Sequence, residues 1–338
     1  MFHFIEIIRA IATILIANSH FKGVYPTDVL SFGGGFGLAL FYMISGFLLA
    51  NIKPGTGLLS WYGKKVARLY IPLILLKAVE VLIGYLKIES VERFIREFIF
   101  PASWFGASML ILYLVYYWIV KMVYNKTGMG AVRIYNVICL VAFLWMFMTK
   151  CRIGMFSLET LRVADVFGIE TPYLISLPVW MMAMLIGFEL RKAFDSRSAA
   201  FTRGWEMWLY GAGILVFTAV FLAAKIWEKR DAGSALMILL PISYIGFACC
   251  VFCFFAGQET KIRLIADTLP KKILFLVSSC SLEIYYIQFP WIHLLKKYAF
   301  PVNWILIVIV TIFSGYILHC VSNIVYGVFM KKAGRKYE

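Results

Sequence analysis

Charged residues are scarce in this sequence. Asp, Glu, Lys and Arg account for 15% of the 338 residues, while 62% are hydrophobic and the mean hydropathy is +0.84. Soluble domains carry about a quarter charged residues, so the composition excludes a typical soluble protein. The apolar runs are about 17 to 25 residues long without polar alternation, which indicates membrane-spanning helices rather than barrel strands. We therefore expect an all-α fold, a polytopic membrane helical bundle with about ten transmembrane helices.

Long polar segments are also missing. No loop is long enough to form a separate soluble domain and no internal repeat is visible, so we expect a single transmembrane domain over residues 1–338. The expected spans are residues 4–21, 33–50, 69–86, 104–124, 132–149, 173–190, 207–227, 234–256, 273–295 and 303–328.

Acidic residues are fewer than basic ones, 18 against 33, which gives a net charge of +15. The basic residues are scattered between the apolar runs, as in the positive-inside pattern of membrane proteins, so we expect a lipid bilayer and no nucleic acid as partner. If the N-terminus is cytoplasmic, nineteen Lys and Arg residues fall on that side and twelve on the other. We therefore expect both termini in the cytoplasm.

The cysteines do not form a recognisable framework. There are seven, an odd number, and most lie inside apolar runs, so a disulfide scaffold is not expected. Cys250 and Cys253 have the spacing of a metal or redox pair, but no second ligand pair lies nearby. We expect no metal site.

Two ionisable residues occur in the first apolar run, "EIIRAIATILIANSHF" (6–21). Arg9 and His20 are almost three helical turns apart, so they share one face and lie about 16 Å apart along the axis. Glu6 precedes Arg9 by one turn and can pair with it. An Arg inside a membrane costs about 2.5 to 3.5 kcal/mol and usually faces the bundle interior or a water-filled cavity. The alternative is that Arg9 reaches the headgroups and His20 only caps the helix.

Arginine is suited to binding phosphate, and histidine to transferring a proton near neutral pH. A phosphate-rich carrier with a long arm could therefore be held at Arg9 and present its reactive group near His20. Other polar residues in the runs allow two interpretations. Ser45 and Ser281 either line a cavity or allow close helix packing, and packing is the simpler choice. Glu283 needs a partner, whereas no partner is evident for His319, which we expect to be buried and neutral.

Several segments, in order, resemble the acyltransferase-3 family, which are bacterial integral-membrane O-acyltransferases acting on cell-surface sugars. The resemblance covers most of the chain. It rests on the Arg-x10-His spacing of Arg9 and His20, with Glu6 upstream. It continues in "GGGFGLALFYMISGFLLA" (33–50), "YGKKVARLYIP" (62–72), "SWFGASMLILYLVYYW" (103–118) and "SLEIYYIQFP" (281–290).

The match has departures. Gln288 stands where the family usually has His, and a Gln can hydrogen-bond but cannot titrate. His293 lies roughly 140° around the helix from that position and is a poor substitute. The Glu-Pro pair that usually closes the last helix is absent.

The resemblance implies transfer of an acyl group, most often acetyl, from acyl-coenzyme A to a hydroxyl of a cell-surface or lipid-linked glycan, in the bacterial inner membrane. Lys64, Lys65 and Arg68 would bind the nucleotide phosphates, with Ser45 nearby. Without the resemblance, these basic residues would simply be topology determinants.

In the same scheme Arg9, paired with Glu6, would hold phosphate or the pantetheine end, and His20 would be the general base. The polar residues of the segment 281–290 would contact the acceptor: Glu283, Tyr285 and Gln288.

A different class of function is compatible with the same composition. A glycan exporter or flippase could use a charged cavity to guide a lipid-linked sugar phosphate. Transporters often have paired half-repeats or spans broken by Gly and Pro, and the sequence shows no such pair. A membrane sensor is the weakest alternative because no soluble output domain is visible.

Overall fold

The computed structural model describes residues 2–53, 55–99, 104–152, 171–196, 204–228, 230, 235–264 and 268–332. All regular secondary structure in these residues is helical, which confirms the all-α expectation. The helices are α1 (His3–Ser19), α2 (Gly34–Leu49), α3 (Leu58–Leu82), α4 (Val91–Phe94), α5 (Trp104–Tyr117), α6 (Asn125–Thr127), α7 (Met129–Arg152), α9 (Thr171–Ser196), α10 (Gly204–Glu228), α11 (Leu239–Ala256), α12 (Glu259–Leu264), α13 (Leu269–Ser279), α14 (Ser281–Leu295) and α15 (Val302–Lys332). A π-helical segment, Trp118–Tyr124, joins α5 to α6.

The number of membrane spans differs from the expectation. Within the described ranges, six helices are long and apolar enough to cross a membrane, or seven if α13 and α14 together count as one bent span. The count of about ten is therefore not confirmed. Two of the remaining expected spans coincide with helices that are short or charged: α1 has 17 residues, and α3 carries Lys65, Arg68, Lys77 and Glu80. The Lys77 and Glu80 side chains satisfy each other at 3.0 Å.

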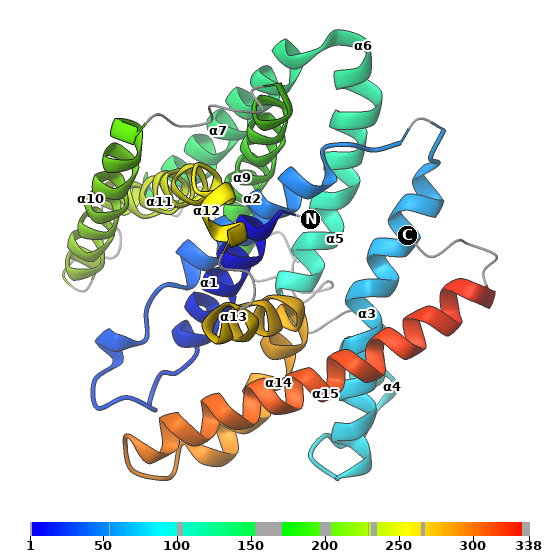
Figure 1. The fold of residues 1–338 in the computed structure, drawn as a ribbon. Helices are drawn as coiled ribbons and strands as arrows, with labels where there is room; N and C mark the ends of the chain where they lie inside the picture. Colours follow the sequence, from blue (N-terminus) through cyan, green and yellow to red (C-terminus); the bar gives the residue numbers. More distant parts are fainter. Residues whose placement is uncertain are drawn as a thin grey trace.

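Helix α1 lies inside the bundle and organises the elements around it (Figure 1). It contacts α2, α11, α12, α13 and α14. Its first N–H groups, which have no partner within a helix, donate to the carboxylate of Glu259 on α12, from His3 at 3.1 Å and from Phe4 at 2.7 Å. A carboxylate at this end also complements the helix dipole, so α12 fixes where α1 begins.

Helices α2 and α9 pack closely because both have a glycine where they cross. A Cβ atom at Gly46 would lie 1.8 Å from the carbonyl oxygen of Met184, and one at Gly187 would lie 2.0 Å from that of Met43. Small residues allow helix backbones to approach in this way in membranes. The contact holds α2, and with it Ser45, at a fixed distance from the rest of the bundle.

The span near the C-terminal end is broken. α13 and α14 are separated by Cys280 and meet at 79°. The break places the start of α14 in the interior of the bundle, between α1 and α15. Irregular backbone at membrane depth is tolerated where it is enclosed by protein or lines a cavity.

The α2–α9 contact generates a stability prediction. Gly46→Ala should lower the free energy of unfolding in detergent by about 1 to 3 kcal/mol, because the added methyl group collides with backbone that cannot move away. Gly130→Ala in α7 is the matched control, since a Cβ there meets nothing within 4 Å. Thermal unfolding of both variants measures the difference. Equal midpoints for Gly46→Ala and wild type would show that the close contact is not needed.

Candidate functional site

A cavity of about 590 Å³ lies among α1, α2, α3, α5, α13, α14 and α15. It is lined by both polar and apolar side chains. The lining residues that bear on function are Arg9, Ser45, Lys65, Arg68, Tyr113, Ser278, Ser279, Ser281, Glu283, His319, Ser322, Asn323 and Tyr326. Five of the ten site residues predicted from the sequence are therefore brought together in one space: Arg9, Ser45, Lys65, Arg68 and Glu283.

One side of this cavity carries three cationic side chains: Arg9 from α1, and Lys65 and Arg68 from α3. Within the part of the chain that the structure describes, Arg68 has no carboxylate partner and is exposed. The Lys65 ammonium lies 5.7 Å from the ring centroid of Trp61, in a cation–π contact. Lys64 does not line the cavity, so the structure separates it from the other two basic residues of its segment.

Arg9 is held by the carboxylate that the sequence suggested. Its Nη1 lies 3.4 Å from Oε2 of Glu6, one turn earlier on α1. Glu6 is buried, and the same oxygen accepts a short hydrogen bond from the Ser278 hydroxyl on α13. The Arg9 side chain keeps 23% exposure, toward the cavity. Glu6 thus ties α1 to α13 and orients Arg9 without neutralising the other cations.

The cavity is also lined by a polar chain from α14 and α15. Nδ1 of His319 lies 3.0 Å from Oε1 of Glu283, and Nδ2 of Asn323 lies 2.9 Å from Nε2 of His319. The expectation that His319 lacks a partner is therefore wrong. Its partner, Glu283, is 36 residues away in sequence, and the pairing depends on the packing of α14 against α15. Ser322 is buried beside them, and its hydroxyl has no partner among the described residues.

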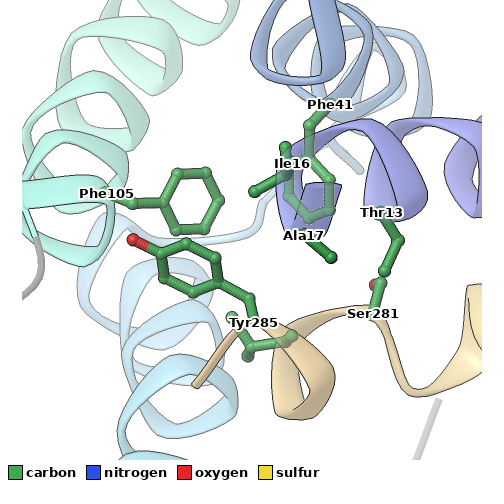
Figure 2. A pocket seen from close by; sticks show the side chains of 8 residues that line it. Thr13, Ile16, Ala17, Phe41, Phe105, Ser281 and Tyr285 are labelled. Atoms are coloured by element: carbon green, nitrogen blue, oxygen red, sulfur yellow. The ribbon is translucent and has the colours of Figure 1, made fainter. Parts of the chain in front are cut away.

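Ser45 and Ser281 both line the cavity, so the packing interpretation is incomplete for these residues. The Ser45 hydroxyl donates to the carbonyl of Phe41, one turn earlier. Ser281 lies at the start of α14 and also borders a second, narrower space of about 10 Å³. Figure 2 shows this space between α1 and α14, with aromatic rings on one side and Thr13 and Ser281 on the other.

The narrow space shares Phe41, Ser281 and Leu282 with the large cavity and lies beside the part of α1 between Arg9 and His20. Three residues of α1 line it: Thr13, Ile16 and Ala17. Thr13 is four positions after Arg9 and Ala17 is three before His20, so these residues form one stripe along the helix. Along this part of α1, Arg9 lines the large cavity and Thr13, Ile16 and Ala17 line the narrow space, whereas His20 lines neither.

His20 follows directly after α1 and is half-buried. Its Nδ1 lies 2.8 Å from the carbonyl oxygen of Ile16. A carbonyl can only accept, so this contact assigns the proton to Nδ1 and leaves Nε2 with a free lone pair. The imidazole packs edge-on against Phe289 at 4.9 Å and Tyr285 at 5.9 Å between ring centroids. A neutral imidazole with Nε2 available can act as a general base.

Gln288 lies next to His20, at the position where the family usually has His. Its amide nitrogen is 3.1 Å from the carbonyl of Tyr285 and 3.3 Å from Nδ1 of His20. The side chain is fully buried, and its Oε1 has no partner among the described residues. Tyr285 borders the narrow space, one turn after Ser281 on α14. Gln288 and Tyr285 are thus at the His20 end, whereas Glu283 faces the large cavity.

The family model described as an acyltransferase domain, Acyl_transf_3, matches residues 2–321. The chain belongs to the acyltransferase-3 family. A search of curated proteins and a search of solved structures gave no significant match. Membership in the acyltransferase-3 family and the membrane-spanning helices together identify a membrane acyltransferase.

The sequence missed three features of the site of this acyltransferase. His319 and Asn323 belong to the cavity, and their spacing of four residues on α15 was the only local signal. The structure also shows that Lys65 and Arg68 line the cavity and Lys64 does not. The sequence of the basic segment alone does not reveal this difference. The link between Glu6 and Ser278 joins residues 272 positions apart, and no local pattern marks it.

The Glu6 network generates a second prediction. Glu6→Gln should lower the free energy of unfolding by about 1 to 3 kcal/mol, because the partly buried Arg9 loses its counter-charge. Glu89→Gln is the control: its pair with Arg93 is 3.7 Å long and the Glu89 side chain is 70% exposed. That change should cost less than about 1 kcal/mol. Chemical or thermal unfolding in detergent compares the two, and an equal effect would contradict the role of Glu6.

Proposed function

We propose that this membrane acyltransferase moves an acyl group, most simply acetyl, from acyl-coenzyme A to a hydroxyl of a cell-surface or lipid-linked glycan. The observation that carries the proposal is the continuity of the site. Arg9, Lys65 and Arg68 line the large cavity, and the narrow space that shares residues with it borders the part of α1 that runs from Arg9 toward His20. Guanidinium and ammonium groups bind phosphates, and coenzyme A combines phosphates with a long arm that ends in the reactive sulfur.

In the proposed reaction His20 is the general base. Its Nε2 takes the proton of the acceptor hydroxyl while the hydroxyl oxygen attacks the thioester carbonyl carbon. The carbon–sulfur bond then breaks, and the imidazolium returns the proton to the sulfur, so that coenzyme A leaves as the thiol. The hydrogen bond from Nδ1 to the carbonyl of Ile16 keeps Nε2 directed at the reacting hydroxyl. Gln288 and Tyr285 lie beside His20, and in this proposal they contact the glycan.

The proposed orientation puts both termini on the cytoplasmic side of a bacterial inner membrane. The donor then enters from the cytoplasm, where acyl-coenzyme A is made, through the large cavity. His20 lies nearer the outer face, where a surface glycan is accessible. The excess of Lys and Arg on the side of the termini supports this orientation.

Binding of the acyl donor is tested by removing the cationic side chains of Lys65 and Arg68, which line the large cavity. Lys65→Ala and Arg68→Ala should each weaken acetyl-coenzyme A binding by roughly ten-fold or more, because each removes a charge-assisted contact to phosphate. Lys64→Ala is the matched control, since Lys64 does not line the cavity, and its affinity should stay within about two-fold of wild type. Protection of the purified protein against thermal unfolding measures the affinity. A glycan exporter should gain no protection at all, and that result would overturn the proposal.

The catalytic role is tested separately. His20→Ala should lower the turnover number by about 100-fold to 10,000-fold while donor binding is preserved, because only proton transfer is lost. His293→Ala on α14 is the control, since its ring packs against Tyr85 and does not border either space. Ester-linked acyl groups on surface glycan are measured after complementing a deletion strain with each variant. Full acylation with His20→Ala would contradict the general-base role.

A further inference from the structure

The first turn of α14 opens where the two spaces meet. Ser281 and Leu282 line both the large cavity and the narrow space that leads toward His20. The first N–H groups of a helix have no partner within the helix. In α14 the earliest backbone bond is from Ile284 to the carbonyl of Cys280, at 2.8 Å. The N–H groups of residues 281, 282 and 283 therefore have no acceptor within α14.

The Ser281 hydroxyl is a second, independent sign of a missing partner. Ser281 is only 9% exposed, and among the described residues its hydroxyl has no hydrogen bond. The neighbouring serines at the same break are satisfied. The Ser278 hydroxyl donates to Glu6, and the Ser279 hydroxyl donates to the carbonyl of Leu276 at 2.8 Å. Ser281 borders both spaces, so its hydroxyl is free to donate to a group that enters the cavity.

The charges around this turn determine which group suits it. Glu283, in the first turn of α14, already places a carboxylate at this positive helix end. A second anion here would be repelled by Glu283, whereas Arg9, Lys65 and Arg68 attract anions to the other side of the cavity. The turn therefore suits an uncharged acceptor, and an amide carbonyl accepts from both N–H and hydroxyl donors.

The position of the turn identifies the part of the donor that carries such a carbonyl. Ser281, Tyr285 and Gln288 lie on one face of α14, and Gln288 is about 10 Å further along the helix axis than Ser281. Gln288 lies beside His20, so Ser281 lies between the cationic wall and the general base. In acyl-coenzyme A the segment between the phosphates and the sulfur is the pantetheine arm, which contains two amides.

We propose that the Ser281 hydroxyl and the first N–H groups of α14 bind an amide carbonyl of the pantetheine arm. This inference rests on the proposed function, because it takes acyl-coenzyme A as the donor. The contact sets how far the arm extends along α1 and hence places the thioester at His20. Ser281 binds the acyl donor, acyl-coenzyme A, and takes no part in bond breaking.

The test combines two variants of Ser281 with acetyl-coenzyme A and with two analogues of it. Ser281→Ala should raise the KM for acetyl-coenzyme A by about two-fold to ten-fold, because one neutral hydrogen bond is lost. Ser281→Thr, which keeps the hydroxyl, should restore most of the affinity. Ser243→Ala on α11 is the control and should leave the KM unchanged, since that hydroxyl bonds to its own helix and Ser243 lines neither space. The second donor is an acetyl-coenzyme A analogue in which methylene replaces an amide carbonyl of the arm, made for each amide in turn.

The outcomes separate the inference from the proposed function. For one of the two analogues, wild type and Ser281→Ala should bind equally well, because the carbonyl that Ser281 binds is already missing. A Ser281→Ala penalty that stays the same with both analogues would overturn the inference, as would a KM equal to that of wild type for acetyl-coenzyme A. If wild type neither binds nor uses acetyl-coenzyme A, the proposed function itself fails. Thermal unfolding of each variant verifies that folding is intact.

Discussion

The site depends on the contacts of the Glu6 carboxylate with Arg9 and Ser278. An arginine inside an apolar bundle must be compensated, and Glu6 compensates Arg9 from the same helix while accepting from Ser278 of α13. The contact fixes α1 against the broken span and keeps the guanidinium directed into the cavity. Because α1 is also capped by Glu259, both the position and the rotation of the helix are set. His20, eleven residues further along, is oriented as a consequence.

The cavity has two unlike walls, and this asymmetry orients a ligand. Cationic groups lie on α1 and α3, while the Glu283–His319–Asn323 chain lies on α14 and α15. A ligand with phosphates at one end is drawn to the first wall and repelled by Glu283 on the second. Its uncharged part is left to follow the stripe on α1. The narrow space there, about 10 Å³, is smaller than an acyl thioester. The aromatic side chains that border it must therefore move when a donor reaches His20.

The local periodicity of the sequence was enough to predict some of this arrangement. A 3.6-residue repeat predicts Arg9 and His20 on one face and Glu6 beside Arg9, and the structure confirms the pairing of Glu6 with Arg9. Contacts between segments that are distant in the sequence could not be predicted in this way. The pairing of His319 with Glu283 depends on the crossing of α14 and α15, which no spacing within either helix reveals. Which basic residue of the α3 segment faces the cavity depends on the rotation of that helix. The expected count of about ten spans is not confirmed among the described residues, because apolar runs such as those in α1 and α3 form helices that are shorter or more charged than the helices identified as able to span.

The most direct test is a structure of the protein with a thioether analogue of acetyl-coenzyme A, which binds but cannot transfer its acyl group. The account predicts phosphates within hydrogen-bond distance of Lys65 and Arg68, an arm that passes Ser281, and the sulfur beside Nε2 of His20. An analogue bound outside the cavity, or with its phosphates at the His20 end, would contradict it.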